Sequence, residues 1–191
     1  MREIRILCVV ILVAGGALTA RAAYIRVKAD LAEVLIRRAW NENVRTGEAR
    51  RPWRHADLHP VAKLRIPRLK YEEFVLDSAA PRTLAFGPGL VKNGTELGRR
   101  GNVAIAGHRT SWFRPLEKIE RGDAIELEWY DAGTKSVRER TYRVQRIEVA
   151  EPGNVGLLRQ TDEDVLTLIT CYPFGYGAKS PQRFVVRAIL R

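Results

Sequence analysis

The sequence predicts a mainly β protein, in which a compact barrel or sandwich follows a helical N-terminal segment. From residue 61 onward, seven or eight short segments rich in β-branched and aromatic residues alternate with glycine, proline and charged clusters. Before residue 60, apolar residues instead form one uncharged run or recur at helical spacing. At 191 residues the chain has room for one well-buried domain and an appendage, and not for two full-sized domains.

Composition narrows the class of protein. Lysine and arginine number 33 against 22 acidic residues, a formal charge of +11. The basic residues are scattered and form no arginine-rich arm, zinc finger or aromatic RNA-binding signature, so nucleic acid is not a predicted partner. An anionic bilayer explains the excess better. The two cysteines, Cys8 and Cys171, are too few for a disulfide framework, and no spacing typical of metal ligands occurs, so no metal or cofactor is predicted.

The first residues are typical of a signal anchor. Residues 6–20 (ILCVVILVAGGALTA) carry no charge and follow Arg2 and Arg5. This run is short for a bilayer span, which needs about 17 to 25 residues. A helix that continues beyond Arg21, whose side chain would snorkel to the interface, is long enough. We therefore assign residues 1–25 to an uncleaved, single-pass membrane anchor.

Two aspects of this anchor stay open from the residues alone. A cleaved signal peptide is the alternative, because Ala20 and Ala22 are small residues near a possible cleavage point. Basic residues also lie on both sides of the apolar run, so charge does not decide the topology.

A stalk helix and a linker are predicted for residues 26–59. Apolar residues recur at helical spacing over residues 24–40, which predicts a helix that stands free as a stalk or packs on the domain. Residues 41–60 are polar and contain glycine and proline, which favours a linker.

The β domain is predicted to span residues 60–191. Residues 124–130 alternate apolar and acidic side chains, whereas residues 165–171 (VLTLITC) form a continuous apolar run typical of a buried strand. A short helical turn is expected at residues 114–119. The strands are expected at residues 61–66, 71–76, 102–108, 124–130, 140–150, 165–171 and 183–190.

Three residues at strand ends are candidates for acyl transfer. Cys171 is the only cysteine outside the apolar N-terminal run. An unpaired thiol outside the cytoplasm is exposed to oxidation, so its presence there suggests a chemical role. His108 ends one strand and Arg183 begins the last. A thiolate can attack a carbonyl, a histidine can carry the proton and an arginine can stabilise the oxyanion. His55 and His59 are weaker candidates, because they lie in the linker.

These residues resemble the signature of the sortase family. Residues 168–171 (Leu-Ile-Thr-Cys) are similar to the Leu-x-Thr-Cys strand end that carries the sortase nucleophile, and Gly107-His108 and Arg183 match the family's histidine and arginine in order. The resemblance covers residues 60–191. The stalk helix, residues 83–89 and the loop that begins at residues 171–174 (Cys-Tyr-Pro-Phe) further resemble the proteobacterial class GN subgroup.

The resemblance implies a fold, an activity and a location. It implies an eight-stranded β-barrel that faces the outside of the cytoplasmic membrane, in the periplasm if the source is Gram-negative. It implies that a secreted protein with an LPxTG-like C-terminal sorting signal is cleaved through a thioester on Cys171 and passed to an amine acceptor. It also implies an oxyanion contact for Thr170 and a peptide groove that includes Tyr172, Phe174 and Tyr176.

Two alternatives use the same sequence features differently. A thiol hydrolase would share these residues and release the acyl group to water. A non-catalytic, anchored β-barrel binding module would leave Cys171 inert. The Ser-His-Gly-Cys context of L,D-transpeptidases is absent.

Overall fold

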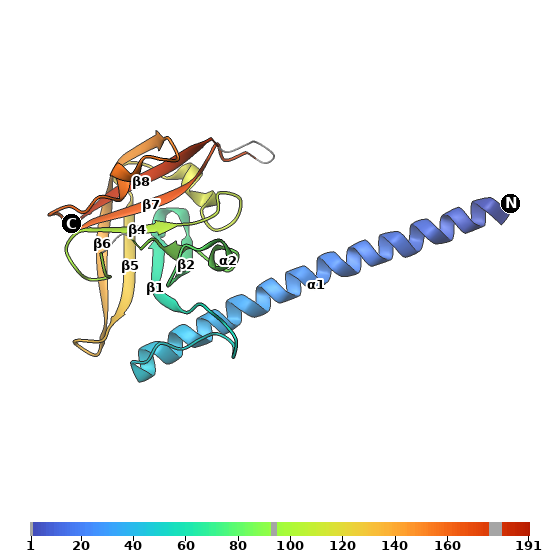
Figure 1. The fold of residues 1–191 in the computed structure, drawn as a ribbon, viewed down its shortest axis with the longest axis horizontal. Coiled ribbons are helices and arrows are strands. Elements are labelled where there is room, and N and C mark those ends of the chain that lie inside the picture. The colour runs from blue at the N-terminus through green and yellow to red at the C-terminus, as the bar shows by residue number, and fades with distance from the viewer. Residues whose placement is uncertain (1, 93–94, 176–180) are drawn as a thin grey trace.

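A computed structural model of the chain describes residues 2–92, 95–175 and 181–191 (Figure 1). It contains one long helix, α1 (Arg2–Thr46), which projects away from a closed barrel of eight strands. The strands are β1 (Pro60–Ile66), β2 (Tyr71–Leu76), β3 (Gly89–Leu90), β4 (Asn102–Ala106), β5 (Ala124–Asp131), β6 (Ser136–Ala150), β7 (Val165–Tyr172) and β8 (Gln182–Leu190). The short helices are η1 (Pro67–Leu69), α2 (Pro81–Leu84), η2 (Arg114–Lys118) and η3 (Val155–Leu158).

The barrel confirms the predicted fold class and excludes a sandwich. Its strand order is β1-β2-β3-β4-β7-β8-β6-β5, closing on β1. Seven strands lie where the hydrophobic pattern predicted them. The eighth, β3, spans two residues and is too short to give a pattern. β6 begins at Ser136, ahead of the predicted residue 140.

The pattern of buried residues along each strand shows which side chains form the core. β1 buries every second residue, whereas β4 and β7 are buried along most of their length. β4 and β7 are parallel neighbours, in keeping with the continuous apolar run seen in the sequence of β7. The core contains Leu64, Val75, Ile105, Leu127, Leu168 and Val186, all at most 1% exposed.

The C-terminal end of α1 is part of the domain. Ile36 and Trp40 pack against Leu58 and against Phe74 of β2, with 6.1 Å between the ring centroids of Trp40 and Phe74. Asn43 donates a hydrogen bond from Nδ2 to the carbonyl of Pro60 at 2.9 Å. The helix therefore packs on the barrel at this end, and the linker predicted from residue 41 begins only after Thr46.

Among the residues that the structure describes, no helix combines the length and the apolar character that a membrane crossing requires. The anchor predicted for residues 1–25, and the division of the chain at residues 26 and 60, stay predictions.

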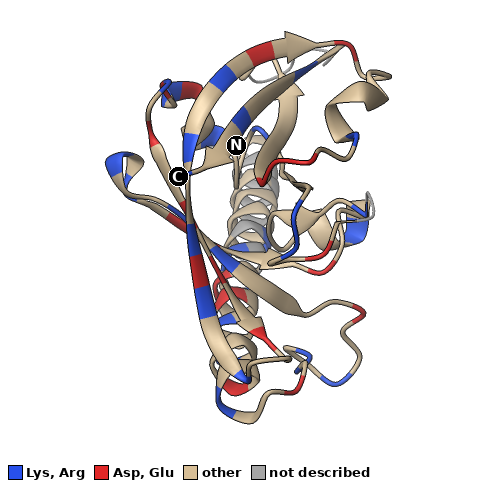
Figure 2. Ribbon diagram, turned by 90° about the vertical axis from the view of Figure 1, so that its left-hand side faces the viewer, with Lys and Arg blue, Asp and Glu red and all other residues tan. Residues whose placement is uncertain are grey.

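Basic and acidic residues are both distributed along the strands of the barrel (Figure 2). Arg65 of β1 forms ion pairs with Glu126 of β5, at 2.9 Å, and with Glu139 of β6. Lys63 and Glu128 form a further pair at 3.8 Å. Because these ion pairs are partly exposed, each adds little stability. Together they give the outer face of the sheet a polar surface.

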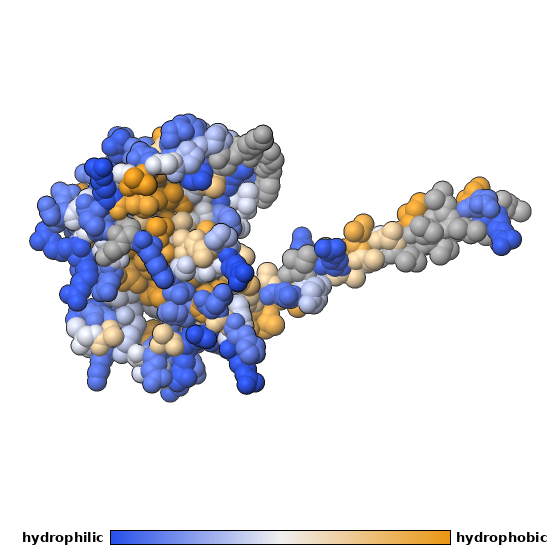
Figure 3. Space-filling view, in the orientation of Figure 1, coloured by the Kyte–Doolittle hydropathy of each residue, from blue (hydrophilic) through white to orange (hydrophobic). Residues whose placement is uncertain are grey.

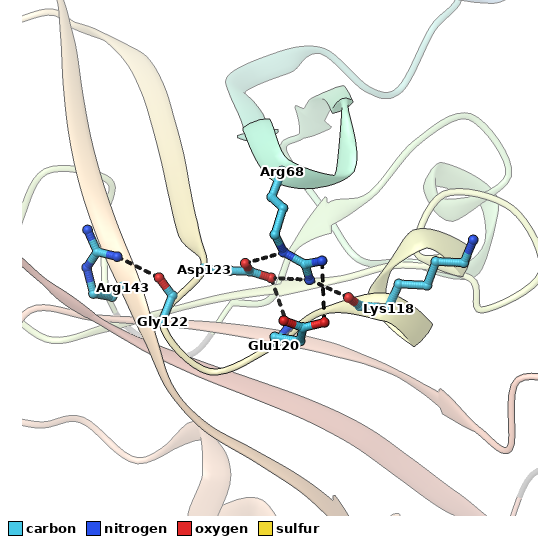
Figure 4. A network of polar contacts seen from close by, with 6 residues as sticks. All are labelled: Arg68, Lys118, Glu120, Gly122, Asp123 and Arg143. Carbon is cyan, nitrogen blue, oxygen red and sulfur yellow. Dashed lines mark hydrogen bonds and ion pairs between the residues drawn. The ribbon is translucent and has the colours of Figure 1, made fainter.

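A second polar network fixes the connection between β4 and β5 (Figure 4). Arg68 of η1 donates two hydrogen bonds to the carboxylate of Asp123, at 2.5 and 2.8 Å. The same carboxylate accepts from the backbone N–H of Glu120 at 2.8 Å. The Arg68 hydrogen bonds lower the pKa of Asp123 below its ordinary value. The segment after η2 is thereby tied to the β1–β2 turn.

The carboxyl group of Glu73 lies between α1 and β2, where its charged form is disfavoured. Burial, and then the proximity of Glu33 and Glu72, raise the pKa of Glu73 from 4.5 to about 7, while Arg37 of α1 opposes the shift. Because the folded state favours the protonated form, stability is present below the unfolded pKa and falls as the pH rises from there through about 7.

We expect Glu73→Gln to remove this loss of stability at higher pH. Chemical denaturation at pH 5 and pH 8 should show that the wild-type protein is destabilised at pH 8 relative to the variant by about 1 kcal/mol, discounted for partial solvent exposure. Glu151→Gln, which removes an exposed carboxylate that takes no part in the shift of Glu73, is the control and should change the difference little. Equal pH dependence in wild type and Glu73→Gln would contradict the prediction.

Candidate active site

The parallel pairing of β4 and β7 brings His108 and Cys171 to the same rim of the barrel. Both strands run in the same direction, and Ala106 lies opposite Ile169. The backbone N–H of Gly107 continues the pairing with a hydrogen bond to the carbonyl of Ile169 at 3.1 Å. His108 follows at once and is exposed, and Cys171 lies two positions after Ile169.

Arg183 reaches the rim from the other side of β7. β8 pairs antiparallel with β7, and Cys171 lies directly opposite Arg183. Side chains of directly opposite residues extend on the same face of a sheet, with Cβ atoms about 4.5 to 5.5 Å apart. Cys171 is a free, partly exposed cysteine, and Arg183 is half-buried. The structure thus brings the three predicted residues to one rim, with Cys171 on the central strand.

Thr170 lies beside Cys171, but its side chain is buried. Its hydroxyl donates a hydrogen bond to the carbonyl of Gly107 at 2.7 Å, and the residue is 2% exposed. Because this hydroxyl has a single proton, it is already engaged in linking β7 to the residue before His108. The predicted oxyanion contact of Thr170 stays a prediction.

Aromatic side chains pack around the start of the loop that follows Cys171. Tyr172 stacks on Phe184 of β8 at 6.2 Å, and Phe174 contacts Phe184 edge to face at 5.0 Å. Phe174 is only 8% exposed and belongs to the core. Its ring therefore supports the loop from within, and a direct role in the peptide groove stays a prediction. Tyr176 lies outside the described residues. Hydrophobic residues gather over β7 and β8 on the face that Figure 3 shows.

Arg109 is a residue that sequence reasoning missed. Its guanidinium Nη1 donates a hydrogen bond to the carbonyl of Pro173, so it joins the segment after His108 to the loop after Cys171. The only signal in the sequence was its place next to His108, which does not separate it from a solvated arginine.

Neither a metal-ligating cluster of described residues nor the cleft beside α1 adds a functional residue to this rim. Within the described ranges, no group of three or more His, Cys, Asp or Glu residues is placed to hold a metal ion. A cleft of about 660 Å³ lies between the end of α1 and the β5–β6 turn, lined among others by Trp40, His59 and Tyr130. Cys171, His108 and Arg183 do not line this cleft.

We expect Phe174→Ala to destabilise the protein by about 3 kcal/mol, because it removes a buried ring from the core. Chemical denaturation measures this change. Phe86→Ala, which truncates a ring that is 38% exposed, is the matched control and should cost distinctly less. Equal losses for the two variants would show that the Phe174 ring does not pack in the core.

Comparison with known proteins identifies the family of the chain. Residues 64–191 match the model of the sortase domain. The chain is 27% identical to sortase D of Bacillus subtilis over 124 residues, which are 64% of this chain and 60% of that protein. It is 30% identical to sortase A of Bacillus anthracis over 130 residues, 66% of this chain and 57% of that protein. The chain therefore spans less than two thirds of the length of these relatives.

Solved structures show the same fold. Sortase A from Corynebacterium diphtheriae superposes with a TM-score of 0.61 and 28% identity, covering 72% of this chain and 63% of that one. A Clostridium perfringens sortase D5 transpeptidase superposes with a TM-score of 0.66 over 85% of this chain and 99% of that one, at 20% identity. Because the sortase domain covers most of its length, this chain belongs to the sortase family.

Proposed function

We propose that the protein is a membrane-anchored cysteine transpeptidase that cleaves an LPxTG-like sorting signal near the C-terminus of a secreted protein and transfers the product to an amine. The observation that carries the proposal is the position of Cys171 on β7, directly opposite Arg183 of β8 and beside the strand that ends at His108. The family membership of the chain and the name of the Clostridium perfringens transpeptidase support it.

Each of the three side chains has one role in the proposed reaction. The Cys171 thiolate attacks the carbonyl carbon of the scissile bond, and the Arg183 guanidinium stabilises the oxyanion that forms. The His108 imidazolium gives a proton to the leaving amine as the carbon–nitrogen bond breaks, leaving a thioester on Cys171. The neutral imidazole then takes a proton from the incoming amine, whose nitrogen displaces the thiolate.

The N-terminal segment is proposed to hold the enzyme at the cytoplasmic membrane with its barrel outside the cytoplasm. The support is the uncharged run at residues 6–20, preceded by Arg2 and Arg5. α1 has 45 residues, a length of about 68 Å at 1.5 Å per residue, so its two ends lie far apart. An anchor at its N-terminal end would leave the barrel clear of the lipid headgroups.

Mass spectrometry of the protein incubated with an LPxTG peptide tests the activity. We expect an acyl adduct on Cys171, and a ligated product when an amine is added. An adduct that always ends in hydrolysis would identify a thiol hydrolase. No adduct with any sorting peptide, together with no labelling of Cys171 by iodoacetamide, would favour a binding module.

We expect His108→Ala and Arg183→Ala each to lower kcat/KM by about 10² to 10³-fold with little change in melting temperature, because they remove the proton carrier and the oxyanion partner. Peptide cleavage assays measure this. Arg187→Ala, four positions further along β8, is the matched control for a lost positive charge and should retain most activity. A fully active His108→Ala or Arg183→Ala variant would remove that residue from the mechanism.

We expect the full chain to sediment with membranes and to be released by detergent and not by alkaline carbonate. A variant that lacks residues 1–25 should appear in the soluble fraction. Release of the full chain by carbonate would contradict a membrane-spanning anchor.

A further inference from the structure

The hydrogen bond that the Thr170 hydroxyl donates indicates that this residue positions its neighbours. We propose that Thr170 and Gly107 form a clamp that holds the His108 side chain beside Cys171, so that Thr170 is a positioning residue and not an oxyanion donor. The inference rests on the proposed function for its importance, but the clamp itself is a property of the fold.

In this clamp, both polar backbone groups of Gly107, the residue before His108, form hydrogen bonds with β7. The Gly107 N–H donates to the carbonyl of Ile169 at 3.1 Å, and the Gly107 carbonyl accepts from the Thr170 hydroxyl at 2.7 Å. Both partners belong to β7 and lie directly before Cys171. The backbone on which His108 is mounted is therefore attached to the strand that carries the sulfur, and not merely near it.

The chain after His108 is held as firmly. The His108 carbonyl accepts from the N–H of Phe113 at 2.9 Å, which closes the turn that follows β4. Phe113 has no exposed surface and contacts Tyr71 edge to face at 6.5 Å between ring centroids. An exposed imidazole thus stands on a backbone that is fixed on both sides.

Gly107 is required for space at this point. A Cβ atom at residue 107 would lie 2.8 Å from two ring carbons of Phe113, a separation that real Cβ atoms do not show. The Phe113 ring can therefore lie against residue 107 while the Thr170 hydroxyl donates to its carbonyl only if residue 107 has no side chain. A side chain here would push the ring away and release the turn that carries His108.

The hydrogen-bond count argues against an oxyanion role for the Thr170 hydroxyl. Its proton is already donated, and donation to a substrate oxyanion would leave the Gly107 carbonyl without this partner in a buried place. The clamp and the oxyanion contact therefore exclude each other for a single hydroxyl.

Alkylation of Cys171 by iodoacetamide separates the two roles. The thiolate displaces iodide from carbon, so no oxyanion forms and no peptide is needed. The rate of alkylation from pH 5 to pH 9 reports how the sulfur interacts with its neighbours, and His108→Ala provides the profile of a site without the imidazole.

We expect Thr170→Val, which keeps the shape and removes the donor, to move the alkylation profile toward that of His108→Ala and to lower kcat by about tenfold. Thr170→Ser, which keeps the donor, should retain the wild-type profile. Gly107→Ala keeps the Thr170 hydroxyl yet should give the same profile as Thr170→Val, and the double variant should be no worse than either one.

A Thr170→Val protein that loses transpeptidation but keeps the wild-type alkylation profile would overturn the proposal and favour an oxyanion role. Additive losses in the double variant would overturn it as well. Because alkylation needs no sorting peptide, failure of the clamp is distinguishable from failure of the proposed function, which would appear as a wild-type protein that alkylates normally and forms no acyl adduct.

Discussion

The pairing of β4 with β7 is the constraint on which the site depends. Parallel neighbours end at the same rim, so the residues that follow them meet there whatever the length of chain between them. Both strands are buried over most of their length, and a slip by one residue would turn their core side chains to the wrong face. The register that places Ala106 opposite Ile169 therefore also sets where His108 stands relative to Cys171.

The rest of the barrel supports this pair from both sides. β8 adds Arg183 opposite Cys171, and closure of the sheet leaves no free edge to loosen β7. The connection that leaves β4 is held at its start by the Gly107 backbone and at its end by the hydrogen bonds between Arg68 and Asp123. A histidine on a loop between two such attachments has little backbone freedom, which suits the proton transfer proposed for His108.

α1 shows how one element can combine two roles. Its C-terminal end buries Trp40 and hydrogen-bonds through Asn43 to the start of β1, so this part behaves as a component of the domain. The rest of the helix projects away from the barrel (Figure 1). Burial, and then the charge of Glu33 on α1, raise the pKa of Glu73 on β2, so the folded state loses stability as the pH rises.

The sequence by itself determined the strands and the candidate residues, because both follow from local patterns. Alternation and continuous apolar runs marked seven strands, and Cys171, His108 and Arg183 stood out as reactive types at strand ends. Resemblance to the sortase motif then identified the family, which the domain match confirms.

Only the tertiary structure decided which of these residues meet and what their neighbours do. The closed strand order, the two-residue β3 and the extension of α1 to Thr46 depend on contacts between distant segments. The burial of Phe174 and the hydrogen bond from Thr170 to Gly107 are likewise invisible locally, because each joins residues that are neighbours in space and not in sequence. Side-chain type is a property of the chain, whereas the partner of a hydroxyl or a ring is a property of the fold.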